Sequence, residues 1–210
     1  MEWLRYLEKY NISFQVNILN KEDSILVNKN NKIIYIIDGF MQKLQVFTNG
    51  EKLCTQLLYK NHILKKIKLT KHLPDKRDNH YYELIALKRT IIITFEEQEL
   101  ILKSSMYNQS IYYQQHSLSS NYNEDIIGIT SHKNTKKRLI QFLFVLIERL
   151  GVVTKKQIII PLNLSHYTIA TIIGSQRITV NRIMNELKNK KILSYDNKKI
   201  SIINIIQLIY

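Results

Sequence analysis

The chain has 210 residues, which is long enough for one large domain or two modest domains with their own hydrophobic cores. It carries 31 lysines and arginines against 17 aspartates and glutamates, and this formal net charge of +14 favours a polyanionic partner. The single cysteine, Cys54, excludes an intramolecular disulfide framework and any zinc or iron–sulfur site built on cysteines of this chain. The abundance of Ile, Lys, Asn and Tyr is typical of very AT-rich genomes, such as those of plastids and endosymbionts.

The first ten residues, M-E-W-L-R-Y-L-E-K-Y, predict a short amphipathic helix. They lack the apolar core of a signal peptide and are too acidic for a transit peptide. No uncharged apolar run reaches the ~18 residues that a membrane helix needs. We therefore expect no membrane partner, and a location in the plastid stroma or, for a bacterial source, the cytoplasm.

Residues 12–95 contain short apolar or alternating runs, rich in β-branched and aromatic residues and separated by Asn, Asp, Gly and Lys. Such runs predict the strands of an antiparallel roll or barrel, here over residues 13–19, 24–27, 32–39, 42–47, 52–59, 81–87 and 90–95. Asn49-Gly50 predicts a tight hairpin. The lysine-rich residues 62–80, which include Pro74, are predicted to form an irregular exposed loop.

Residues 96–130 have a more helical pattern, first over 97–102 and then through a longer polar segment. The apolar stripe of that segment is too weak for an isolated helix, so we expect it to pack on the roll and on a second copy in a homodimer. The predicted domains are a β-roll over residues 1–100, a dimerisation helix and linker over 101–132, and a C-terminal domain over 133–210.

The C-terminal domain carries most of the basic excess. Residues 133–199 hold 14 lysines and arginines and 3 acidic residues, net +11, which leaves net +3 for the rest of the chain. Thr135 is predicted to cap a helix that Gly151 ends, and a short strand, two helices and a β-hairpin around Asp196-Asn197 follow. This order predicts a winged helix-turn-helix.

The two helices are predicted within residues 164–187, which read L-S-H-Y-T-I-A-T-I-I-G-S-Q-R-I-T-V-N-R-I-M-N-E-L. Ser165 and Ser175 are each expected to cap one helix. Ala170 allows the helices to approach, and Gly174 permits the positive φ of a tight turn. For this motif by itself, an ordinary helical hairpin with a polar face is the alternative.

The polar side of the second helix offers donors suited to DNA. Arginine can bind guanine O6 and N7, glutamine or asparagine can pair with adenine, and a threonine methyl or Ile178 can touch a thymine methyl. The polar residues predicted on this side are Gln176, Arg177, Thr179, Asn181 and Arg182. The apolar residues Ile178, Ile183, Met184 and Leu187 recur at near-helical spacing, and Val180 adds to the packed side. The basic residues expected to hold phosphates are those at 136–138 together with Lys188, Lys190, Lys191, Lys198 and Lys199.

Two stretches, R-L-I-Q-F-L-F-V-L-I-E-R-L-G-V (138–152) and residues 158–194, resemble the DNA-binding half of the CRP/FNR family of transcription regulators. The resemblance is greatest to the NtcA branch, the nitrogen regulators of cyanobacteria and red-algal plastids. Shorter runs, I-Y-I-I-D-G, N-G-E-K-L and L-L-Y-K-N, resemble the family's effector-binding roll. The resemblance implies an α+β fold with an N-terminal jelly roll of the cyclic-nucleotide-binding type, a long dimerisation helix and a C-terminal winged helix-turn-helix.

The resemblance also implies a function. It implies a homodimer that reads a near-palindromic promoter with GTA and TAC half-sites in double-stranded DNA, regulates nitrogen-responsive genes and contacts RNA polymerase. Arg177 and Arg182 match the family's recognition-helix arginines, and Ile178 stands where some members carry a base-reading glutamate. The residues expected at the DNA are Ser165, His166, Ser175, Gln176, Arg177, Ile178, Thr179, Val180, Asn181, Arg182, Lys198 and Lys199.

The effector site departs from the family pattern. After L-L-Y-K-N (57–61), the sequence lacks the Phe-Gly step that the NtcA branch uses for 2-oxoglutarate. Glu124 falls where that branch has a glutamate, but the matching arginine aligns near Ser119, and the other expected arginine falls near Arg77 or Asn79. Because a carboxylate ligand is held best by arginines, we expect 2-oxoglutarate binding to be altered or lost.

Motifs for other chemistry are missing from the sequence. The six histidines are dispersed, and neither a phosphate-binding loop nor a dinucleotide fingerprint is present. We therefore expect no metal site, no cofactor and no enzymatic activity. A general nucleic-acid or RNA-binding interaction protein without effector control is the alternative function.

Overall fold

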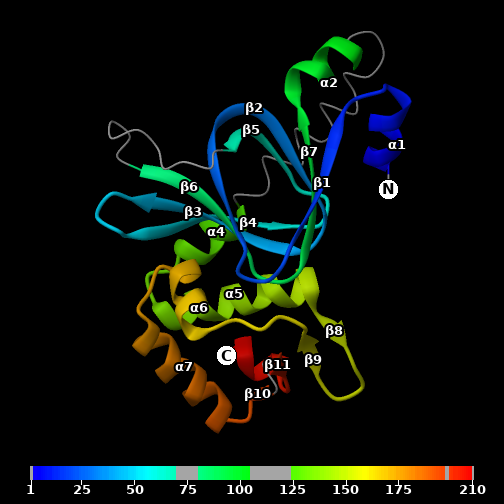
Figure 1. Ribbon diagram of the computed structural model, residues 1–210. Coiled ribbons are helices and arrows are strands. Elements are labelled where there is room, and N and C mark those ends of the chain that lie inside the picture. The colour runs from blue at the N-terminus through cyan, green and yellow to red at the C-terminus, as the bar shows by residue number, and fades with distance from the viewer. Residues whose placement is uncertain (1, 70–79, 105–123, 197–198, 210) are drawn as a thin grey trace. The chain divides into compact units, whose positions relative to one another are not determined.

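The computed structural model describes residues 2–69, 80–104, 124–196 and 199–209 (Figure 1). They belong to two compact units. The N-terminal unit comprises Met1–Lys52 and Gln56–Tyr122, and the C-terminal unit comprises Asn123–Tyr210 together with Leu53–Thr55. Most of the predicted dimerisation segment, 105–123, lies outside the described residues.

The N-terminal unit is built on an antiparallel sheet, which confirms the predicted β-rich fold. Its strands run in the order β1-β7-β2-β6-β3-β4, and β5 pairs with β2. Its elements are α1 (Glu2–Lys9), β1 (Phe14–Leu19), β2 (Ser24–Asp38), β3 (Phe40–Phe47), β4 (Lys52–Tyr59), β5 (Ile63–Leu69), β6 (His80–Ala86), β7 (Thr90–Glu96) and α2 (Glu97–Ser104). Gly50 (φ 85°) lies in the predicted hairpin between β3 and β4.

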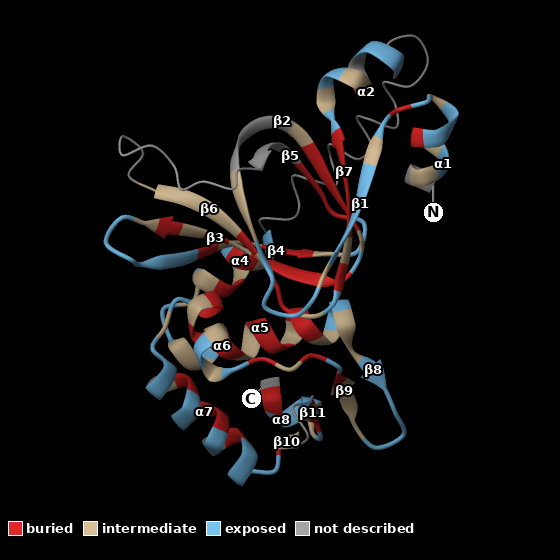
Figure 2. Cartoon of the chain, in the orientation of Figure 1, coloured by how far each residue is buried: buried red, intermediate tan, exposed pale blue. Residues whose placement is uncertain are grey.

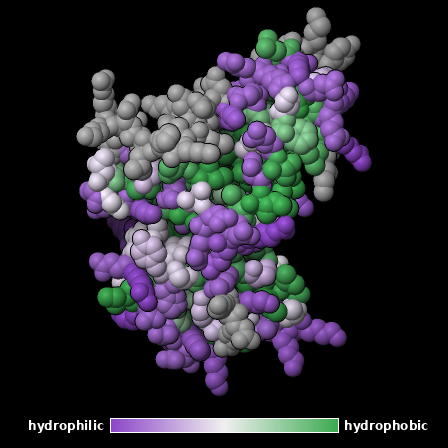
Figure 3. All heavy atoms as spheres, in the orientation of Figure 1, coloured by the Kyte–Doolittle hydropathy of each residue, from purple (hydrophilic) through white to green (hydrophobic). Residues whose placement is uncertain are grey.

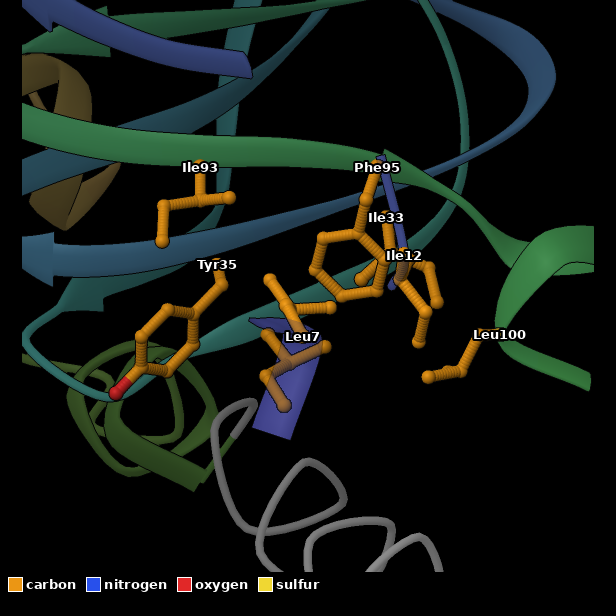
Figure 4. Packing of buried hydrophobic residues seen from close by; sticks show 8 residues of the cluster. Leu7, Ile12, Ile33, Tyr35, Ile93, Phe95 and Leu100 are labelled. Carbon is orange, nitrogen blue, oxygen red and sulfur yellow. The ribbon is translucent and has the colours of Figure 1, made fainter. Parts of the chain in front are cut away.

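Both faces of the sheet are buried along β2. Because side chains alternate along a strand, Ile33 and Tyr35 enter one apolar cluster while Ile34 and Ile36 enter another. The first cluster joins the sheet to the two helices of this unit, since Leu7 of α1 and Leu100 of α2 pack into it (Figure 4). Burial on both faces explains why the run K-I-I-Y-I-I-D is apolar without alternation.

Two predictions in this unit were wrong. The segments 24–27 and 32–39 form one strand, β2, whose pairing with β5 changes register between Asn28 and Lys32. Residues 63–69, predicted as part of a loop, form β5, with Ile63 and Leu64 buried. The polar run N-K-N-N and the lysine-rich run K-K-I-K do not look like strands in the sequence. Both segments become strands because they pair with each other through their backbones.

The C-terminal unit has the predicted order of helix, strand, two helices and hairpin. Its elements are α4 (Glu124–Thr130), α5 (Thr135–Leu150), β8 (Val152–Val153), β9 (Ile158–Ile160), α6 (His166–Ile173), α7 (Arg177–Asn189), β10 (Leu193–Asp196), β11 (Lys199–Ile202) and α8 (Ile205–Ile209). The strands form one sheet in the order β10-β11-β9-β8. The edge strand β8 and the terminal helix α8 were not predicted.

Helix α5 forms the centre of this unit. Leu139, Phe142, Leu143 and Leu146 recur at helical spacing and are fully buried. The helix is capped by Asn134, whose side chain accepts from the Lys136 N–H at 2.7 Å, so the prediction of Thr135 as the cap was wrong by one residue. Gly151 ends the helix as predicted.

Candidate nucleic-acid interface

Helices α6 and α7 form the predicted helix-turn-helix. Ser165 caps α6, since its hydroxyl accepts from the Thr168 N–H at 3.0 Å. Gly174 then adopts the left-handed conformation (φ 62°, ψ 54°), and the Ser175 N–H donates to the Ala170 carbonyl at 2.9 Å. These contacts close the last turn of α6 and redirect the chain into α7 within a few residues.

Helix α7 begins one residue later than predicted. Its N-cap is Gln176, in an extended conformation and with no side-chain capping bond, so the prediction that Ser175 caps this helix was wrong. Ser175 instead belongs to the turn, where its backbone closes α6. The first backbone N–H groups of α7 therefore receive no side-chain cap from Gln176.

One side of α7 packs into the C-terminal unit, which is seen as a stripe of buried residues along the helix (Figure 2). Val180, Ile183, Met184 and Leu187 are buried on this side. Val180 is completely buried, so it holds α7 in place and is removed from the residues expected to contact DNA.

The other side of α7 is open to solvent. Gln176, Arg177, Asn181 and Arg182 are exposed, and Thr179 is half-buried. Ile178 lies on the same side with 80% of its surface exposed, so the prediction that it joins the packed apolar residues of this helix was wrong. An apolar side chain so exposed does not stabilise the fold of the unit, and this is consistent with an apolar contact to a partner. Hydrophilic residues cover most of the α7 region in Figure 3.

Glu186 is the only acidic residue of α7, and two lysines neutralise it. Its Oε1 lies 2.8 Å from Lys136 Nζ of α5 and 3.1 Å from Lys190 Nζ. These hydrogen bonds lower the pKa of Glu186 to about 2. The carboxylate therefore holds α5 to α7, and its charge is compensated before any polyanion approaches.

Arg138 of α5 supports the turn between the two helices. Its Nε donates to the His132 carbonyl at 2.6 Å, and one terminal nitrogen donates to the Gly174 carbonyl at 3.1 Å. Lys136 and Arg138 were expected to hold phosphates, but each has a partner within the unit. The sequence signal that could have indicated this role is their position in the first turn of the helix that precedes the motif.

The hairpin β10–β11 is tied to the start of α6 by Tyr195, a residue that the sequence did not single out. Its hydroxyl donates to the Leu164 carbonyl at 2.6 Å, and its ring centre lies 5.9 Å from that of His166. Burial, and then the positive charge of Arg177, lower the pKa of His166, while a side-chain hydrogen bond to Asn181 opposes them. His166 thus stands between the wing and α7.

The remaining predicted site residues lie apart from this face or beyond what is described. Lys199 is exposed at the start of β11, whereas Lys198 lies outside the described residues. Glu124 is exposed in the first turn of α4, and its expected companions Arg77, Asn79 and Ser119 also fall outside them.

Metal centres and membrane-spanning helices are two further classes of site. Among the residues that the structure describes, no three His, Cys, Asp or Glu side chains are grouped so as to hold a metal ion. Within the same ranges, no helix has the length and apolar character needed to cross a membrane.

Comparison with known proteins agrees with this geometry. Residues 137–209 match the family profile of the Crp-like helix-turn-helix domain. The chain is 28% identical over 205 residues to the HTH-type transcriptional regulator ycf28 of Porphyra purpurea, covering 95% of this chain and 83% of that one. It is 27% identical over 183 residues to the global nitrogen regulator of Synechococcus elongatus, covering 84% and 79% of the two chains.

A solved structure extends the similarity to the whole fold. The crystal structure of a CRP-family transcriptional regulator from Thermus thermophilus superposes with a TM-score of 0.72 at 11% identity, covering 91% of this chain and 94% of that one. At this identity the match establishes the fold. Residues 137–209 therefore form a Crp-like helix-turn-helix domain, and the chain as a whole is similar in sequence to two transcription regulators and in fold to a CRP-family regulator.

Proposed function

We propose that the protein is a homodimeric regulator that reads a near-palindromic site in double-stranded DNA. The observation that carries this proposal is the solvent-facing side of α7, where Arg177, Ile178 and Arg182 are exposed and the only acidic residue of the helix is neutralised. Two such helices in a dimer would enter successive major grooves ~34 Å apart.

Each exposed residue has a proposed part in binding. Arg177 and Arg182 donate to guanine O6 and N7, and Ile178 packs on a thymine methyl. Gln176 and Thr179 contact base edges or the adjoining backbone. The residues proposed to contact phosphates are Ser165, His166, Ser175, Lys198 and Lys199.

The regulated genes are proposed to be those with nitrogen-responsive promoters, and RNA polymerase is proposed as a second partner. This rests on the Synechococcus relative, which is a global nitrogen regulator, and on the similarity over 84% of the chain. The amino-acid composition, which is typical of AT-rich genomes, and the Porphyra relative support a location in the plastid stroma.

We expect 2-oxoglutarate to bind weakly or not at all. Glu124 is the one residue of the expected effector set among the described positions, and a carboxylate repels a dicarboxylate unless arginines accompany it. Calorimetric titration of the full chain with 2-oxoglutarate tests this, and a dissociation constant in the micromolar range would contradict it.

Selection of bound duplexes from a random-sequence pool, followed by footprinting, tests the proposed readout. We expect a two-fold symmetric consensus with protected bases one helical turn apart. The alternative is a general nucleic-acid-binding protein, which the net charge of +11 over residues 133–199 would also support. That protein would enrich no consensus and would protect the backbone uniformly.

A further inference from the structure

The groups proposed to contact phosphates lie on two separate elements of the C-terminal unit. Ser165 and His166 stand at the start of α6, whereas Lys199 is exposed on the wing, the hairpin formed by β10 and β11. The phosphates of a duplex have a fixed spacing, so both elements can bind at once only if their relative position is held. Binding is tighter when the protein holds such an arrangement before the DNA arrives.

The inner part of the wing is held by the sheet. Ile200 and Ile202 are buried, and β11 pairs with β9 from Ile200 to Ile202. Lys199 lies one residue outside this pairing, opposite Asp196 of β10. Because a ribbon of two strands is only marginally stable by itself, the outer end of the wing needs a further contact if Lys199 is to keep its place.

Tyr195 makes a contact of this kind. It lies opposite Ile200 in the hairpin, and its hydroxyl donates to the Leu164 carbonyl at 2.6 Å, a distance well within the normal range for an O–H donor. Its ring centre lies 5.9 Å from that of His166. The acceptor is itself fixed, since the Leu164 side chain is buried and the next residue, Ser165, caps α6. Tyr195 thus joins the outer part of the wing to the first turn of α6.

We propose that Tyr195 is a positioning residue for DNA binding. Its bond to the backbone before α6 holds the wing beside that helix, so that Lys199 and His166 meet the phosphates as one preformed surface. Tyr195 acts through the wing lysines without touching DNA itself. Its effect extends to every duplex, because phosphates carry no sequence information. This inference rests on the proposed DNA binding through the wing and α6.

Tyr195→Phe tests the inference, because it removes the hydroxyl and keeps the ring. Ser194→Ala is the matched control, since it removes a hydroxyl from the neighbouring half-buried residue, whose side chain points to the other face of β10. A variant with Lys198→Ala and Lys199→Ala, alone and combined with Tyr195→Phe, reports whether the effect passes through the wing lysines.

The full chain and each variant are titrated by fluorescence anisotropy with two duplexes. One duplex carries GTA and TAC half-sites, and the other has the same composition in scrambled order. Denaturant unfolding of each variant measures its free energy of unfolding, so that binding is compared among fully folded proteins.

We expect Tyr195→Phe to weaken binding to both duplexes by about two- to tenfold, the range that the net contribution of one hydrogen bond allows. The ratio of the two affinities should stay the same. In the protein without the wing lysines, Tyr195→Phe should have no further effect. Ser194→Ala should bind as the unaltered protein does.

Two results would overturn the inference while leaving the proposed function standing. One is a loss of less than twofold on both duplexes for Tyr195→Phe, because the bond would then serve the fold alone. The other is an equal loss with and without the wing lysines, because the hydroxyl would then act elsewhere. Equal affinity of the unaltered protein for the two duplexes would instead refute sequence readout, and the comparison with and without the wing lysines would still decide the role of Tyr195.

Discussion

Single residues of α7 differ sharply in what they do for the fold. Val180 is completely buried, whereas Ile178, two positions earlier, has 80% of its surface exposed. Burial of a branched aliphatic side chain stabilises a protein by about 1.5–3 kcal/mol, and Ile178 contributes little of this in the free protein. An exposed isoleucine at this position is explained if a thymine methyl covers it in the complex.

Arg177→Ala is expected to cost about 1–3 kcal/mol of binding free energy and to relax specificity at one base pair. Its guanidinium is exposed at the start of α7, where it can donate two bonds to a guanine. Lys199→Ala is the matched comparison. A wing lysine that binds a phosphate strengthens binding to all sequences alike, so its removal should weaken binding to all of them equally. Competition assays over single-base variants of the site measure both effects, and an equal loss on every sequence for Arg177→Ala would refute its role in base readout.

Glu186→Gln is expected to remove a pH-dependent part of the stability. The folded-state pKa of Glu186 is about 2, below its ordinary value of 4.5, so its stabilisation is present above pH 4.5 and is lost as the pH falls toward 2. Denaturant unfolding of both proteins between pH 6 and pH 2 should show curves that converge at the acid end. Glu148 lies on the exposed side of α5, and Glu148→Gln is the control. This variant should keep the pH-dependent stability that Glu186→Gln loses.

At the level of elements, the orientation of α7 depends on the turn that precedes it. Ser165 fixes where α6 begins, Gly174 ends it in a left-handed conformation, and Arg138 binds the Gly174 carbonyl from α5. Each contact acts on the backbone of the motif and leaves the exposed side of α7 free. The helix-turn-helix can therefore be perturbed without altering the residues of α7 proposed to read bases.

Ser165→Ala should lower the free energy of unfolding by about 1 kcal/mol, since it removes the side chain that accepts the Thr168 N–H. Ser175→Ala should change it little, because Ser175 contributes backbone contacts to the turn. Chemical denaturation of the two variants under the same conditions compares them. Equal destabilisation would contradict the assignment of the caps.

Gly174→Ala and Gly128→Ala are expected to have opposite effects. Gly174 has a φ of 62°, which strains an alanine even though an added Cβ would meet Arg138 at an ordinary 3.6 Å, so we expect a loss of about 1 kcal/mol. Gly128 lies within α4, and its added Cβ would come no nearer than 4.0 Å to Gln141, so alanine should stabilise by about 0.5–1 kcal/mol. Thermal and chemical unfolding measure whether each variant is less or more stable than the unaltered protein.

The sequence predicted those elements whose signal is local. Apolar residues at helical spacing located α5, α6 and α7, and Gly174 located the turn. The caps at Asn134 and Gln176 were missed by one residue, because Thr135 is also a capping type and Ser175 is a better one than Gln176, which begins α7 without a side-chain bond. Strand β5 was missed because its place depends on pairing with β2, which lies well earlier in the chain and leaves no local trace.

The candidate site was predicted in its composition but not in its internal contacts. The exposure of Gln176, Arg177, Asn181 and Arg182 follows from helical periodicity alone, whereas the same periodicity placed Ile178 on the packed side, wrongly. The partners of Glu186, Arg138 and Asn181 could not be foreseen in the same way, since they come from other elements or depend on the orientation of one amide. Such contacts decide which charges and donors remain available to DNA.

At the scale of the whole molecule, charge and fold are divided between the two units. The N-terminal unit is a β-sheet of the kind found in CRP-family structures, and the basic excess lies in residues 133–199 with the helix-turn-helix. A basic domain alone attracts any nucleic acid, through phosphate contacts that weaken steeply with salt. Regulation of particular promoters requires in addition that α7 discriminates between sequences.

The measurement that tests this most directly is a salt-titrated fluorescence anisotropy experiment on the full chain. It compares a labelled duplex carrying GTA and TAC half-sites with a scrambled duplex of the same composition. We predict at least a hundredfold preference for the palindrome, ~3 kcal/mol, that remains as salt weakens both complexes. Equal affinity for the two duplexes, falling together with salt, would contradict sequence readout by α7.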